Sequence, residues 1–235
     1  MTESEIYISN TNEAPWRSSI RAAKANLVPG LVLWGIGFGL VLGYYKSPFV
    51  HAGFEYLNFI RSKIGLLFPI LITAVCGGLL PFLYLRQNTQ LRSEYQLKNC
   101  IFLLLFWSYK GLEIEAWYRL QAIIFGPSTH VFTVFLKMLC DQFIYCPLFA
   151  VPLTVLGVSF NHSGLKLSPI LADIKSGGWY RRTILPTLIA NLIIWVPVVC
   201  LVYSLPLPLQ IVLFNLVLVF FILIVSHIER EKQKK

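Results

Sequence analysis

Residues 209–228 read LQIVLFNLVLVFFILIVSHI, and this stretch decides the class of protein to which the chain belongs. It contains no charged residue, and it is about as long as the ~20 residues that an α-helix needs to cross the hydrocarbon core of a bilayer. A buried strand or the core helix of a soluble domain rarely keeps so uniform an apolar run. The stretch therefore predicts a membrane-spanning helix.

Five further apolar blocks precede it along the chain. They cover residues 27–45, 64–85, a block that begins near residue 100, 131–160 and 183–204. The block at residue 100 starts as CIFLLLFW and then turns polar, and the block at 64–85 is interrupted by prolines and glycines. The pattern predicts an all-α, polytopic transmembrane bundle of about six helices within residues 27–228. Residues 1–26 form a polar N-terminal tail, and residues 229–235 form a basic C-terminal tail.

The composition supports a membrane protein. Hydrophobic residues make up 56% of the 235-residue chain and charged residues only 13%, with a mean hydropathy of +0.66. Soluble domains usually carry roughly 25% charged residues. A disordered protein is therefore excluded, and a water-soluble enzyme is disfavoured.

The basic residues are concentrated between and beyond the apolar blocks. The chain has 20 Lys and Arg against 11 Asp and Glu, and the six-span layout places fourteen of these basic residues on one side and four on the other. This bias predicts that both termini lie on the positive side of the membrane, with anionic lipids at the basic loops. A layout with four full spans remains the alternative. Nucleic-acid binding would need a basic face on a soluble element, so no nucleic-acid partner is expected.

Cysteine and histidine give no pattern of a metal or catalytic site. The five cysteines lie in or beside apolar runs without a CxxC pair, and the four histidines are scattered. The chain also lacks GxSxG and phosphate-binding loop motifs. We therefore expect no cofactor, no metal site and no enzymatic activity, with the cysteines as small buried side chains.

The block at 27–45 carries Gly35, Gly39 and Gly43 at four-residue spacing. Glycines at this spacing share one helix face and allow another helix backbone to approach closely. The spacing predicts packing against a neighbouring span of the same chain, with homodimerisation as the alternative.

Charged and amide side chains inside the third and fourth blocks are the candidate functional residues. Lys110 and Glu113 lie in one block, and Lys137, Asp141 and Gln142 lie in the next. Charges in a bilayer are costly, so such groups normally face a bundle interior or a watery cavity. Lys137 and Asp141 are four residues apart and are expected to pair on one helix face. The five residues are interpreted either as a polar path or as buried ion pairs.

Glu115 also lies in the third block, close to Trp117 and Tyr118. A Trp-Tyr pair is typical of the membrane–water interface. This neighbourhood favours an interfacial position for Glu115.

Several motifs resemble those of one family of organelle membrane proteins. Lys137-x-x-x-Asp141-Gln142 followed by Pro147 is similar to a K-x-x-x-D-Q-x-x-x-x-P segment of the peroxisomal 22-kDa membrane protein (Mpv) family. Residues 186–197, PTLIANLIIWVP, resemble its P-T-L-x-A-N-x-x-x-W-P segment, and residues 207–210, LPLQ, fall where V-P-L-Q is expected. The chain thus resembles a divergent member of this family.

The resemblance implies a small helical membrane protein without a cofactor, in the mitochondrial inner membrane or, as the alternative, the peroxisomal membrane. Two functions remain open. One is a small-solute pore or permeability protein that uses the polar residues of the third and fourth blocks. The other is a non-catalytic accessory or structural subunit that contacts other membrane-protein subunits in a larger inner-membrane complex.

Overall fold

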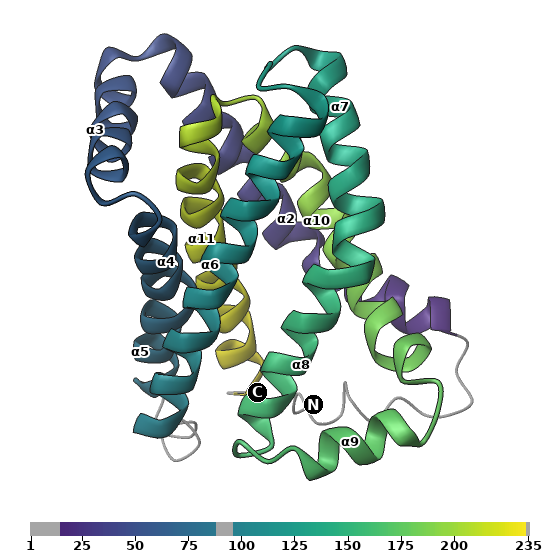
Figure 1. Ribbon diagram of the computed structural model, residues 1–235. Coiled ribbons are helices and arrows are strands. Elements are labelled where there is room, and N and C mark those ends of the chain that lie inside the picture. The colour runs from purple at the N-terminus through teal and green to yellow at the C-terminus, as the bar shows by residue number, and fades with distance from the viewer. Residues whose placement is uncertain (1–14, 88–95, 234–235) are drawn as a thin grey trace.

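The structure is a computed structural model, and the described part of the chain is mostly helical (Figure 1). The structure describes the backbone of residues 15–87 and 96–233, and the side chains of residues 28, 30–87 and 96–220. It contains eight continuous helical segments and no strand within these ranges. The all-α prediction is therefore confirmed.

Most of the helices run lengthwise between two ends of the molecule, whereas α9 (Ser168–Lys175) lies crosswise at the lower end (Figure 1). In chain order they are α2 (Pro15–Lys46), α3 (Pro48–Ile64), α4 (Leu67–Thr73), η1 (Ala74–Leu79), α5 (Leu80–Arg86), α6 (Leu97–Phe125), α7 (Val131–Cys140), η2 (Asp141–Ala150), α8 (Val151–His162), α9 (Ser168–Lys175), η3 (Tyr180–Ile184), α10 (Leu185–Tyr203) and α11 (Leu207–Gln233). The π-helical segments η1, η2 and η3 continue directly into their neighbours, so that α4–α5, α7–α8 and η3–α10 are each one continuous helix.

Each predicted apolar block is mostly helical, but the block at 64–85 begins at the last residue of α3 and crosses the turn at residues 65–66 before α4. Three stretches are long and apolar enough to cross a membrane: Leu67–Arg86, Val131–His162 and Tyr180–Tyr203. Shorter apolar helical stretches are Gly30–Lys46 and Leu207–Phe220. The two helices that the apolar blocks do not account for are α3 and α9.

The predicted tails are partly helical. Helix α2 begins at Pro15, within the predicted N-terminal tail, and α11 continues to Gln233, within the C-terminal one. Residues 1–14 and 234–235 of these tails lie outside the described residues.

A proline lies within or shortly after each π-helical segment. Pro81 follows η1, Pro147 lies within η2, and Pro186 follows η3. Proline has no amide hydrogen to donate, and its ring clashes with the carbonyl four residues earlier. The helix accommodates this clash by widening locally to π turns.

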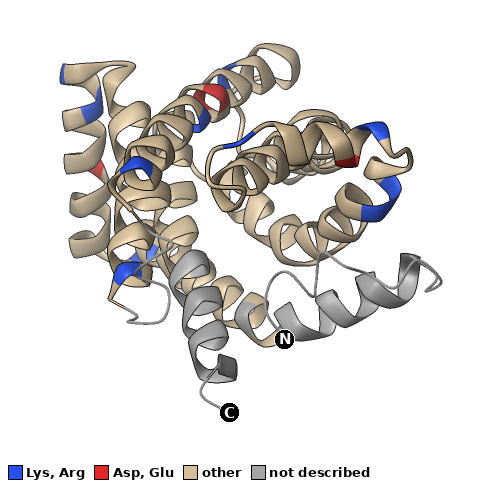
Figure 2. Ribbon diagram, turned by 90° about the horizontal axis from the view of Figure 1, so that it is seen from below, with Lys and Arg blue, Asp and Glu red and all other residues tan. Residues whose placement is uncertain are grey.

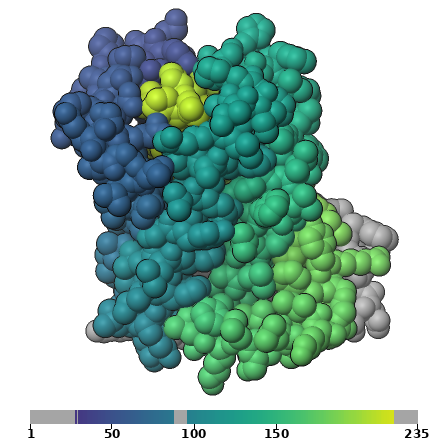
Figure 3. All heavy atoms as spheres, in the orientation of Figure 1, coloured from purple at the N-terminus to yellow at the C-terminus, as the bar shows by residue number. Residues whose placement is uncertain are grey.

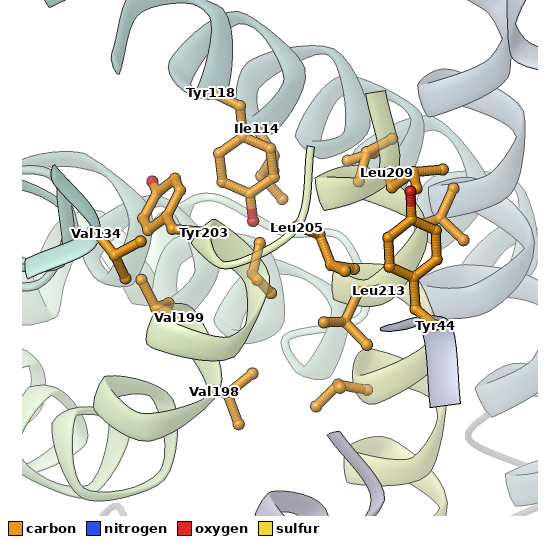
Figure 4. Close-up of a cluster of buried hydrophobic side chains, with 14 of the residues drawn as sticks. Tyr44, Ile114, Tyr118, Val134, Val198, Val199, Tyr203, Leu205, Leu209 and Leu213 are labelled. Carbon is orange, nitrogen blue, oxygen red and sulfur yellow. The ribbon is translucent and has the colours of Figure 1, made fainter. Parts of the chain in front are cut away.

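A buried apolar cluster joins α2, α6, α7, α10 and α11 (Figure 4). Its centre includes the turn between α10 and α11, where Tyr203 and Leu205 are fully buried. Helix α2 crosses α10, and the indole Nε1 of Trp34 donates to the carbonyl of Ile194 at 2.9 Å. The wide gap between the ribbons of α6 and α8 in Figure 1 is filled by side chains in Figure 3.

Glycine allows close contact between helices, but mostly not at the predicted positions. A Cβ atom on Gly35 or Gly39 would meet nothing within 4 Å, and both residues are exposed. The prediction that these two glycines pack on a neighbouring span is therefore wrong, because this side of α2 points away from the rest of the described chain. Gly43 does face a neighbour, Val50 of α3, at 3.1 Å. Gly37, which is not part of the predicted stripe, is buried, and its Cβ would lie 3.0 Å from Leu201 of α10.

Candidate functional site

One face of α6 carries a polar stripe that points toward η2 and α10. Lys110, Glu113, Trp117 and Gln121 are spaced by three or four residues, so they share this face. The stripe extends for about 16 Å along the helix at 1.5 Å per residue. That length is about half of the ~30 Å hydrocarbon thickness of a bilayer.

Asp141 is held by neutral donors from three helices. Trp117 Nε1 and Tyr203 OH donate to its Oδ2 at 2.9 and 2.8 Å, and Gln142 Nε2 donates to Oδ1 at 2.8 Å. The Sγ of Cys146 also donates to Oδ1, at 3.7 Å. Asp141 is 5% exposed. Several hydrogen bonds can stabilise a buried carboxylate without a cation beside it.

Lys137 does not pair with Asp141, so the predicted ion pair is wrong. The Nζ of Lys137 lies 5.8 Å from the centroid of the Tyr203 ring, and the residue is 1% exposed. The backbone between the two residues is regular α-helix, because the N–H of Asp141 still donates to the carbonyl of Lys137. The Asp141 carboxylate instead accepts hydrogen bonds from Trp117 and Tyr203 on other helices.

Lys110 and Glu113 do form an ion pair, as the second interpretation of the sequence expected. Lys110 Nζ lies 2.8 Å from Glu113 Oε1, and Tyr145 OH donates to the same oxygen at 2.5 Å. The Tyr145 ring stacks on that of Trp117, with 4.5 Å between centroids and 13° between planes. Tyr145 binds Glu113 and Trp117 binds Asp141, so the stacked rings bring these two carboxylates into one network.

Gln121 closes the other end of the polar stripe. Its Nε2 donates to the backbone carbonyl of Lys137 at 3.1 Å and to Tyr203 OH at 3.2 Å. Tyr203 thus links Gln121 to Asp141. The network therefore includes four of the five predicted residues directly, and Lys137 through its backbone.

Three buried oxygen atoms of this network have no hydrogen-bond partner among the described residues. They are Glu113 Oε2, Gln121 Oε1 and Gln142 Oε1. All three are acceptors, and they belong to the two helices that face each other across the network. A buried acceptor without a donor costs roughly 1–3 kcal/mol, so water or a donor-bearing molecule is expected beside such atoms.

Glu115 lies in a second charged cluster, on another side of α6. It is 2% exposed, so its side chain faces neighbouring helices and not the outer surface. Its Oε1 accepts from Arg61 of α3 and from Arg119 Nε, the latter at 2.8 Å. Two guanidinium groups compensate the burial of this carboxylate. The pair of Glu115 with Arg61 connects α6 to α3.

Sequence reasoning missed Tyr145, Tyr203, Gln121 and Arg61. Gln121 could have been found from the sequence, because its spacing from Glu113 and Trp117 places all three on one helix face. Arg61 is distant in sequence from Glu115, and no local pattern connects them. The described residues contain no group of three His, Cys, Asp or Glu that could hold a metal ion.

Comparison with known proteins finds no family model that matches the chain, and no similar curated protein or solved structure.

Proposed function

We propose that this chain is a polytopic protein of an organelle membrane and that the polar network between α6, η2 and α10 is a path for a small solute. The proposal has two parts, the placement in a membrane and the path. Each part rests on different observations.

Six crossings are proposed for the membrane domain. The segments are α2, α4–α5, α6, α7–α8, η3–α10 and α11, which run alternately up and down in Figure 1. Three of them are long and apolar enough to span a bilayer on those grounds alone. In α6, Lys110 and Glu113 face the network and Glu115 faces Arg61. The uneven distribution of Lys and Arg supports this layout, with both ends on the positive side.

The three unpartnered acceptors carry the proposal of a path. Glu113 Oε2 and Gln121 Oε1 of the polar stripe, and Gln142 Oε1 of η2, have no donor among the described residues. In a dry apolar interior, each would be a net cost to folding. Water or a solute that passes along the stripe would supply the missing donors. Because all three atoms are acceptors, they favour solutes that are rich in hydrogen-bond donors.

Thiol accessibility tests the path. Glu113→Cys and Gln142→Cys are made in a background in which the five native cysteines are replaced, with Cys146→Ser to keep a hydrogen-bond donor to Asp141. The control is Val198→Cys, in the apolar cluster at 0% exposure. In liposomes, a water-soluble, membrane-impermeant thiol reagent should label positions 113 and 142 but not 198. Protection at 113 and 142 equal to that at 198 would overturn the path.

An accessory-subunit role is the second proposed function, and the outer surface of α2 favours it. Gly35 and Gly39 are exposed on the same helix as Phe38 and Leu42, which are 59% and 47% exposed. Small residues on an outward face allow another helix to approach closely. Migration of the native protein in a large complex, together with protected cysteines at 113 and 142, would favour this function. For either function, we propose the mitochondrial inner membrane, with the peroxisomal membrane as the alternative.

A further inference from the structure

Helix α9 exposes an apolar face that no other described part of the chain covers. Leu167, Leu171 and Ile174 are 61%, 50% and 39% exposed. Their spacing of four and three residues places them on one side of the helix. Ile170 borders the same side and is buried, so it attaches α9 to the rest of the molecule. The rest of this apolar side is exposed on the surface of the described chain.

The backbone on both sides of α9 directs it across the bundle. Gly164 and Leu165 precede it with φ of 67° and 65°, and Gly177 and Gly178 follow it with φ of 82° and 67°. These left-handed conformations turn the chain sharply before and after the helix. Figure 1 shows the result, with α9 along the lower end of the molecule and crosswise to α8. A helix with this direction lies along a membrane surface if the bundle crosses the membrane.

Basic side chains surround the apolar face. Lys166, Lys175, Arg181 and Arg182 are exposed around α9, and Figure 2 shows Lys and Arg at this end of the molecule. Asp173 is the one acidic residue between positions 163 and 185, and it pairs with Arg182 at 2.8 Å. The remaining three basic residues have no acidic partner within this segment. Their charge is complementary to anionic phosphate groups.

Two aromatic residues follow α9 where the chain enters the next helix. Trp179 and Tyr180 begin the helix that leads to α10, and Tyr180 is 43% exposed. Its hydroxyl donates to the carbonyl of Pro147 at 3.0 Å. Trp and Tyr are enriched where acyl chains meet headgroups, because their rings are apolar and their tips are polar.

We propose that α9 is an interfacial helix that docks on the anionic phospholipids of the leaflet in which the protein resides. Leu167, Leu171 and Ile174 insert at the boundary between headgroups and acyl chains. Lys166, Lys175 and Arg181 bind phosphate and carboxylate groups of the surrounding lipids. The inference rests on the membrane placement under the proposed function, but not on the polar path.

A pair of fluorescent probes tests this position. The full chain, in the cysteine-replaced background, is labelled at Leu171→Cys or, one residue later, at Ala172→Cys and placed in bilayers that contain acyl-brominated lipids. The two positions differ by about 100° around the helix. The probe at 171 should be quenched by brominated lipid and protected from iodide, whereas the probe at 172 should be quenched by iodide. Equal quenching of both probes by iodide would overturn the inference, as would protection of position 171 from both quenchers, which indicates a covering protein.

Headgroup preference is measured with the probe at position 171. Brominated phosphatidylserine, present as a minor component, should quench more strongly than the same fraction of brominated phosphatidylcholine. Replacement of Lys166, Lys175 and Arg181 by Gln should lower the apparent affinity for phosphatidylserine about fivefold per residue. The control is Lys63→Gln on α3, an exposed basic residue at another part of the molecule, which should change nothing. Equal quenching by the two lipids in the unsubstituted protein would overturn the inference, even if the protein conducts solutes. Stronger quenching by phosphatidylserine in a protein that conducts no solute would support the inference and count only against the polar path.

Discussion

Gly111→Ala tests how closely α6 packs against α4. A Cβ atom at position 111 would lie 2.2 Å from the carbonyl oxygen of Pro69 and 2.9 Å from Cβ of Thr73. A carbon and an oxygen atom in ordinary contact are about 3.2 Å apart, so the two helices must separate locally by about 1 Å. The nearest obstacle is backbone, which cannot rotate away as a side chain can. The contact therefore has to open, or one helix has to bend.

The magnitude follows from two opposing effects. Alanine in place of glycine stabilises a helix by up to about 1 kcal/mol. Insertion of a methyl group into a tightly packed contact costs typically 1–3 kcal/mol, and more where backbone has to move. We expect a net loss of about 2 kcal/mol in the free energy of unfolding. For a chain of this length, that loss corresponds to a fall in Tm of roughly 4–8 °C.

The assay is thermal unfolding of the purified protein in detergent, followed by the loss of monodisperse protein on heating. Gly39→Ala is the matched control, because its Cβ would meet nothing within 4 Å on an exposed side of α2. Gly39→Ala should leave Tm unchanged or raise it slightly. An equal Tm for the two variants would refute the assignment of α6 and α4 as the close contact.

Two further predictions concern the charged clusters. Glu115→Gln should destabilise the protein by about 2–4 kcal/mol, because the guanidinium of Arg61 on α3 loses its counter-charge. Arg119→Gln changes a side chain that is 54% exposed and should cost less than about 1 kcal/mol in the same unfolding assay. Comparable losses would show that the pair across the two helices contributes little. In double-mutant cycles, Asp141→Asn and Tyr203→Phe should couple by about 1–2 kcal/mol, whereas Asp141→Asn and Lys137→Met should be additive. Strong coupling in the second cycle would restore the ion pair that the sequence predicts.

Local properties of the sequence were sufficient to predict the apolar helices but not α3 and α9. An apolar run of about 20 residues specifies a buried or membrane-spanning helix whatever its neighbours are. All six apolar blocks accordingly are mostly helical. Helix α9 was missed because it is short and its apolar face repeats only three times. The prolines at 81, 147 and 186 mark the π-helical turns, but the width of a turn is not readable from their presence alone.

The partners of polar residues could not be predicted in the same way. Which face of a helix meets its neighbour depends on the rotation of both helices, and a single π turn changes that rotation. Asp141 is an example, because its hydrogen bonds go to Trp117 and Tyr203 on other helices and not to the lysine one turn before it. The glycine stripe of α2 is another, because spacing identifies a common face but not the direction in which that face points.

Solute flux through the purified protein in liposomes tests the polar path most directly. The path predicts ion or small-solute flux above that of protein-free liposomes. It also predicts that Glu113→Gln changes the preference for cations over anions several-fold, because this change removes a carboxylate that has an unpartnered oxygen. Glu55→Gln, at an exposed carboxylate on α3, should leave the preference unchanged. Flux no greater than that of empty liposomes, or flux that is indifferent to Glu113→Gln, would contradict the proposed path.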